Sequence, residues 1–292
     1  MHQFLRAVGF KRIRNREELD FVLKQVIAES GGHRLTRGED GILRVQMEKE
    51  FAPGMGIAVR GEYDEDGEFH LDHYYPYLKN TGVTAAEEIV INKRIDTDAF
   101  TGMCEDIRLG VSLIFYLQNS MDYLDNQSVI KNGSFIAPLH LSGLSAEGKV
   151  ILGVDSKEAD QETHHQETTK RNQLIAEARK GNQEAIDSLT VDDIDLFASI
   201  SRRTKTEDIY SIVESSFIPY GSESDNYSVL GTILSSEEYT NENTGEKIYV
   251  LLVNCNDLEY SICINKEDLM GEPEAGRRFR GTIWLQGQVD FQ

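Results

Sequence analysis

Cysteine is scarce in this 292-residue sequence, with only Cys104, Cys255 and Cys263, and none of the three lies in a CxxC pair. An odd number of scattered cysteines argues against a disulfide framework and a thiolate zinc site, and it is typical of a reducing cytoplasm. Long apolar runs are also missing. The longest, GVSLIFYLQ at 110–118, is about half of what a membrane-spanning helix needs. We therefore expect a soluble cytoplasmic protein with no membrane contact.

Basic residues are few: 30 Lys and Arg stand against 50 Asp and Glu, a formal net charge of −20. Such a surface repels phosphate, so nucleic acid is an unlikely partner on charge alone. The first sixteen residues are the exception, because they carry five basic side chains and no acidic one. These cations could reach an anionic partner or neutralise carboxylates of the protein itself, and we favour the second interpretation.

The N-terminal part is predicted to be a helix packed on a sheet. Asn15 followed by Glu18 is a capping-box start, and apolar residues then recur at helical spacing up to Ser30. Short segments rich in Val, Ile, Tyr and Phe follow, at 42–51, 56–63, 68–75, 88–95, 110–117, 134–142 and 149–155. Asp66-Gly67 predicts a type I′ hairpin turn between two of them. The pattern favours a mainly antiparallel sheet.

Two further segments complete the predicted α+β organisation. Residues 156–216 read as a polar linker and a helical connector. Residues 217–292 contain four strand-like stretches punctuated by glycine, which predict a small, OB-like β-barrel. Trp284, the only tryptophan, alternates with Ile283 and Leu285 and is assigned to the core of that barrel. The expected domains are 1–155, 156–216 and 217–292.

One stretch resembles a phosphate-binding loop. GLSAEGKV, residues 143–150, has the two glycines and the lysine of such a loop, but Val150 replaces the Ser or Thr that holds magnesium. A strand-like segment follows it where a phosphate loop needs a helix. We therefore expect a hairpin turn here and no nucleotide site.

The densest group of potential metal ligands is HLDHYYPY at 70–77. Imidazole and carboxylate groups bind zinc or iron, so His70, Asp72 and His73 are candidate ligands for a metal-assisted hydrolase. On a regular strand, however, His73 would point away from His70 and Asp72. The alternative is an edge hairpin with solvated histidines, and no cofactor is expected.

The C-terminal segment raises a nucleic-acid alternative. Small oligonucleotide-binding barrels combine basic grooves with stacked aromatic rings, and Arg277, Arg278 and Arg280 flank Phe279. Many acidic residues in the same segment oppose this interpretation. Binding of single-stranded nucleic acid through these arginines is therefore an alternative only.

Long phrases of the sequence also point to a family. HQFLRAVGF, CEDIRLGVSLIFYLQN, DDIDLFASISRR, FIPYGSESDNYSVLGTIL and GRRFRGTIWLQGQVDF run from one end of the chain to the other. Together they resemble an uncharacterised family of Firmicutes proteins, mostly from gut Clostridia, that is defined only as a domain of unknown function. The resemblance implies a bacterial cytoplasmic origin and brings no activity, cofactor or site residue.

The sequence shows no complete catalytic constellation. The function it favours is therefore a non-catalytic binding or scaffold protein that acts through protein–protein contacts. The metal-assisted hydrolase and the nucleic-acid-binding barrel remain the two alternatives.

Overall fold

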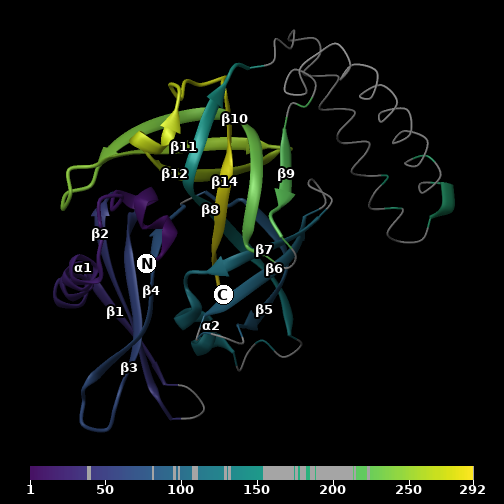
Figure 1. Ribbon diagram of the computed structural model, residues 1–292. Coiled ribbons are helices and arrows are strands. Elements are labelled where there is room, and N and C mark those ends of the chain that lie inside the picture. Colours follow the sequence, from purple (N-terminus) through teal and green to yellow (C-terminus); the bar gives the residue numbers. More distant parts are fainter. Residues whose placement is uncertain are drawn as a thin grey trace.

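The structure, a computed structural model, consists mainly of strands (Figure 1). It describes residues 1–37, 41–80, 82–94, 97, 99–106, 111–127, 130, 133–153, 213, 215–221 and 224–291, with 174, 177, 182–184 and 188. The predicted helical connector therefore lies almost entirely outside the described residues. No helix in the described part of the chain is long and apolar enough to cross a membrane.

The N-terminal part contains a short 3-10 helix, a longer α-helix and a four-stranded sheet. These elements are η1 (Gln3–Val8), α1 (Arg16–Ala28), β1 (Gly32–Arg37), β2 (Leu43–Ala52), β3 (Met55–Tyr63) and β4 (Phe69–Leu78). The strands pair in chain order and antiparallel. The predicted cap of α1 is confirmed, because Oδ1 of Asn15 accepts the backbone N–H of Glu18 at 2.9 Å. The predicted apolar stripe faces inward, as Leu19, Val22, Leu23 and Val26 are buried.

The hairpin between β3 and β4 lies where the Asp66-Gly67 pair predicts it, but its turn type is different. Only Gly67 has a positive φ, 81°, whereas a type I′ turn needs two such residues. The side chain of Asp64 accepts the N–H groups of Asp66 and Glu68 instead. These bonds stabilise a turn that needs a single left-handed residue.

The remaining strands form one ten-stranded sheet. They are β5 (Ala85–Lys93), β6 (Phe100–Asp106), β7 (Val111–Leu117), β8 (Ser134–Ile151), β9 (Ser216–Pro219), β10 (Asn226–Thr240), β11 (Lys247–Cys255), β12 (Leu258–Asn265), β13 (Leu269–Met270) and β14 (Arg278–Val289). Two short helices, α2 (Ser120–Asn126) and η2 (Lys266–Asp268), connect them. Strands from both sides of the expected linker therefore share one hydrogen-bonded sheet.

The pairings of this sheet close into two rings. The first ring runs β5–β6–β7–β14–β8 and back to β5, and the second runs β10–β11–β12–β8–β14 and back to β10. Within the two rings all pairs are antiparallel except β7 with β14 and β12 with β8. The long strands β8 and β14 belong to both rings. Residues 217–292 thus supply four strands of the second ring, and its fifth strand, β8, comes from earlier in the chain.

The stretch 143–150 is not a turn. It lies inside β8, an uninterrupted strand of 18 residues, so the predicted hairpin was wrong. Gly148 is explained by packing, because a Cβ atom there would lie 2.5 Å from Cε2 of Phe279. The close approach of an aromatic ring, and not a turn, requires this glycine.

Two apolar clusters hold the molecule together. One fills the interior of the two rings, and the other lies between their outer surface and the N-terminal sheet. Helix η1 lies between the N-terminal sheet and the two rings (Figure 1). Trp284 belongs to the second cluster, so its assignment to the barrel core was wrong. Its neighbours Ile283 and Leu285 face the interior, and strand alternation directs the indole outward.

Candidate binding pocket at the junction of the two sheets

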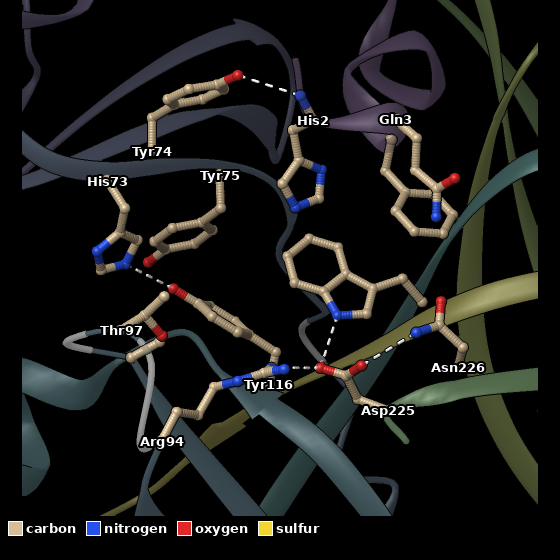
Figure 2. A pocket seen from close by; sticks show the side chains of 13 residues that line it. His2, Gln3, His73, Tyr74, Tyr75, Arg94, Thr97, Tyr116, Asp225 and Asn226 are labelled. Atoms are coloured by element: carbon tan, nitrogen blue, oxygen red, sulfur yellow. Dashed lines mark hydrogen bonds and ion pairs between the residues drawn. The ribbon is translucent and has the colours of Figure 1, made fainter. Parts of the chain in front are cut away.

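A pocket of about 380 Å³ lies where η1, β4 and the first ring meet (Figure 2). We call it the junction pocket. Its lining comes from distant parts of the chain: η1 and the residue before it, strands β4, β7 and β14, the loop between β5 and β6, and the start of β10. The volume falls in the range of small-ligand sites, about 300–1,000 Å³.

Aromatic rings form one wall of the junction pocket. The ring centroid of Trp284 is 5.0 Å from that of Tyr116 and 4.7 Å from that of His2. Tyr75 of β4 continues the series, with its centroid 4.7 Å from Tyr116. Tyr116 and Trp284 point outward from the first ring and form part of this wall, because both alternate along their strands with residues of the ring interior.

Asp225 is the centre of the polar side of the pocket (Figure 2). Its carboxylate accepts the indole N–H of Trp284 at 2.8 Å and pairs with Nη1 of Arg94 at 3.1 Å. Nδ2 of Asn226 also donates to it, at 3.1 Å. The carboxylate is buried, and each of these bonds compensates part of its lost hydration.

Burial favours the neutral forms of three side chains of the pocket, His2, Tyr75 and Tyr116. Burial, followed by the nearby amino terminus, lowers the pKa of His2 to about 4. Burial raises the pKa of Tyr116 and of Tyr75 above the ordinary tyrosine range. Nδ1 of His2 is buried without a hydrogen-bond partner in the described part of the chain. An unused polar atom of this kind is a natural contact for a bound group.

The structure separates the three predicted metal ligands. His70 is exposed and pairs with Asp64 at 2.7 Å, whereas Nε2 of His73 lies 3.2 Å from the hydroxyl of Tyr116 in the junction pocket. A bulge in the pairing of β3 with β4 leaves Asp72 outside the register. Among the described residues, no group of three His, Cys, Asp or Glu side chains could hold a metal ion.

The three C-terminal arginines lie in three different environments. Arg277 pairs with Glu274 at 2.7 Å. The guanidinium of Arg278 is buried and donates to the carbonyls of Leu152 and Val213, at 3.0 and 2.8 Å. Arg280 is exposed. The structure therefore does not gather them into one basic groove.

The basic N-terminal segment pairs largely with the protein's own carboxylates, as favoured above. Arg6 and Lys11 both contact Asp268, at 2.6 and 2.9 Å, and Arg12 contacts Glu267 at 3.0 Å. The C-terminal carboxylates that opposed nucleic-acid binding are in part the partners of this segment.

Among the residues of the junction pocket, sequence reasoning reached only those of the HLDHYYPY stretch, His73, Tyr74 and Tyr75. Trp284 was placed in the core, while His2, Arg94, Tyr116 and Asp225 carried no motif. Tyr116 had one usable signal, the alternation of β7, which predicts an outward side chain. Nothing local connects it with Asp225, since the two meet only through the pairing of β7 and β10 with β14.

Comparison with known families assigns the chain. The family model "Domain of unknown function, E. rectale Gene description (DUF3881)" matches residues 5–287. The chain belongs to this family. The predicted resemblance to an uncharacterised family is thereby confirmed. No curated protein and no solved structure matches the DUF3881 chain.

Proposed function

We propose that this DUF3881 protein is a non-catalytic binding protein that recognises a partner protein in the junction pocket. The observation that carries the proposal is the pocket itself, an aromatic wall facing an ion-paired Asp225 and Arg94. Aromatic and arginine side chains around a small concavity are the usual anchors of protein recognition.

The charge states of the pocket support binding rather than acid–base chemistry. A general acid or base works best with a pKa near the working pH. The pKa of His2 lies near 4 and that of Tyr116 is raised, so neither group exchanges protons readily at neutral pH. The carboxylate of Asp225 is committed to Trp284 and Arg94.

The strand arrangement gives a second line of support. In the first ring, numbered along the chain, the five strands pair in the order one–two–three–five–four and back to one, and strands three and five are parallel. The second ring has the same pairing when β10, β11, β12 and β14 are numbered one to four and β8 is numbered five, which is a circular permutation because β8 precedes β10 in the chain. We propose that both rings are OB-like barrels sharing two strands, as the second was expected to be. OB-like barrels bind ligands at the face of strands two and three and at the loop between strands one and two. In the first ring these parts include Tyr116 and three residues of the loop between β5 and β6, Arg94, Thr97 and Ala99.

The experiment is photo-crosslinking in the native cell. A benzoylphenylalanine is placed at Gln3, an exposed residue of the pocket lining, and as a control at Phe21, which is exposed on α1 outside the junction pocket. The matched variant Thr97→Phe fills the pocket mouth from an exposed position. We expect the probe at Gln3 to form an adduct with one protein, and the probe at Phe21 to form no adduct with that protein. The Gln3 adduct should disappear when Thr97→Phe is introduced.

Trp284 then measures affinity with purified components, because it is the only tryptophan and lies in the pocket wall. Addition of the captured partner should change its emission in a saturable manner. An adduct that persists in Thr97→Phe, or the absence of any adduct at Gln3, would refute the proposal.

A further inference from the structure

The two rings are equivalent at the hairpin between their first and second strands. The last paired residues are Lys93 with Phe100 in the first ring and Thr240 with Lys247 in the second. Each hairpin therefore has a six-residue loop, 94–99 or 241–246. In both loops the backbone N–H of the first residue donates to the backbone carbonyl of the last residue, at 2.9 Å.

The equivalence extends to the third strand. Tyr116 pairs with Thr101, the second residue of β6, and Asn265 pairs with Ile248, the second residue of β11. Both side chains lie on the outer face of their ring, next to the loop that joins its first and second strands. Tyr116 and Asn265 therefore occupy matching positions.

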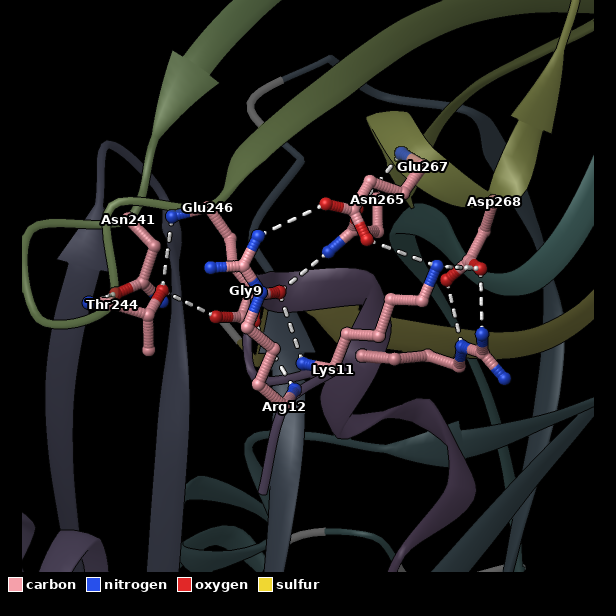
Figure 3. A network of polar contacts seen from close by, with 10 residues as sticks. Gly9, Lys11, Arg12, Asn241, Thr244, Glu246, Asn265, Glu267 and Asp268 are labelled. Carbon is pink, nitrogen blue, oxygen red and sulfur yellow. Dashed lines mark hydrogen bonds and ion pairs between the residues drawn. The ribbon is translucent and has the colours of Figure 1, made fainter. Parts of the chain in front are cut away.

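In the second ring this place is filled by the chain's own N-terminal segment (Figure 3). Asn241, first in the loop, donates to the carbonyl of Val8 at 2.8 Å. Thr244, fourth in the loop, donates to the carbonyl of Gly9 at 2.7 Å. The segment is thus held through its backbone.

The sixth residue of that loop binds the same segment from the other side. The buried carboxylate of Glu246 accepts the N–H groups of Lys11 and Arg12, at 3.0 and 3.1 Å. Asn265 donates to Glu246 at 2.7 Å and orients it. The second ring therefore recognises a peptide by its carbonyl and amide groups.

In the first ring the matching positions line the junction pocket. Arg94 stands first in its loop, Thr97 fourth and Ala99 sixth, and Tyr116 takes the place of Asn265. A hydrogen-bond donor is thus kept at the first and fourth positions, while the carboxylate of the sixth is replaced by a methyl group. A guanidinium has five N–H groups, so Arg94 can hold Asp225 and also donate to a ligand.

We propose that the junction pocket binds a turn-forming peptide segment of the partner, in the manner in which the second ring binds residues 8–12, where Gly9 is left-handed with φ 85°. This inference rests on the proposed function and names the part of the partner that enters the site. Two successive carbonyls of the segment accept from Arg94 and Thr97. With Ala99 in place of Glu246, no carboxylate receives the following N–H groups at that position, and an apolar or aromatic side chain packs against Trp284 and Tyr116 instead.

The test uses random decapeptides displayed on phage and panned on the immobilised full-length chain. Selected peptides are synthesised, and their Kd is measured through the emission of Trp284. The informative variants are Thr97→Val and its matched partner Thr244→Val, since each removes one hydroxyl at the fourth loop position. We expect Thr97→Val to weaken Kd about tenfold, the loss of one backbone hydrogen bond.

Thr244→Val should leave that Kd unchanged and lower only the stability of the fold, because its hydroxyl bonds the chain's own Gly9. An amide-to-ester replacement that weakens the peptide carbonyl facing Thr97 should also raise Kd, and the two changes should not be additive. If selected peptides bind equally well to Thr97→Val, the peptide mode is wrong. If the Gln3 adduct still forms, the proposed function stands and only the peptide mode fails. If the adduct is also absent, the proposed function and the peptide mode both fail.

Discussion

Asp225 and Trp284 are joined by a hydrogen bond of 2.8 Å between the carboxylate and the indole N–H. The backbone carbonyl of Asp225 also accepts the N–H of Leu285, at 2.7 Å. Through Arg94 the same carboxylate reaches the first hairpin loop of the other ring. One buried side chain therefore ties the beginning of β10 to β14 and to the loop that borders the junction pocket.

Asp225→Asn tests this role. The asparagine keeps an acceptor for Trp284 but removes the charge opposite Arg94, and we expect a loss of about 1–2 kcal/mol in the free energy of unfolding. Urea denaturation followed by Trp284 emission measures it. Arg94→Gln and the double variant complete a cycle, in which a coupling of about 1 kcal/mol is expected. Strictly additive effects would contradict a direct interaction.

Glu246→Gln should release the N-terminal segment. The amide cannot match a carboxylate that accepts two backbone N–H groups, and bonds to charged groups contribute about 1.5–3 kcal/mol each. We expect destabilisation of about 2–3 kcal/mol and faster tryptic cleavage after Lys11 and Arg12. Glu242→Gln, an exposed position in the same loop, is the control and should change neither quantity.

The shared strands contain a matched pair of glycines. A Cβ atom on Gly148 would lie 2.5 Å from Phe279, and one on Gly287 would lie 2.5 Å from Phe115. The aromatic side chains of Phe279 and Phe115 are fully buried. Gly148→Ala and Gly287→Ala should therefore each lower the free energy of unfolding by about 1–3 kcal/mol through overpacking. Gly31→Ala has no atom within 4 Å of the new Cβ and should be neutral in the same denaturation assay. A tolerated Gly287→Ala would show that Phe115 can move.

The half-buried His2, whose Nδ1 atom is fully buried, predicts a pH dependence. Its pKa falls from 6.5 to about 4 on folding, so between these values the unfolded chain binds a proton that the folded chain does not. Stability is therefore fully present above about pH 6.5 and decreases as the pH falls towards 4. His2→Phe keeps a ring but cannot be protonated. Between pH 6.5 and pH 4 this variant should lose about 2–3 kcal/mol less free energy of unfolding than the parent chain, as measured by urea denaturation at each pH. Equal losses in both proteins would contradict the burial of His2.

The sequence anticipated local structure well. The Asn15 cap, the buried stripe of α1 and the position of the Gly67 turn follow from short-range rules, and the structure contains each of them. Such features depend on residues a few positions apart, whose interactions the order of the chain already determines.

Long-range pairing explains what was missed. The segment 134–151 reads as two strands because Gly143 and Gly148 frame a turn-like stretch, yet partners on both sides keep it as one. The outward direction of Trp284 follows from alternation, but only the N-terminal sheet packed on that face makes it a pocket residue. Arg94, Tyr116 and Asp225 meet through strand pairings that no local pattern encodes.

The sharing of β8 and β14 has a consequence for synthesis on the ribosome. Neither ring can close before residues 278–289 have left the exit tunnel, because that strand is a wall of both. Until then β8 exposes an unpaired edge along most of its length, and such edges favour association with other chains. Folding must therefore wait for the release of β14, and a nascent chain held short of it is expected to depend on chaperones.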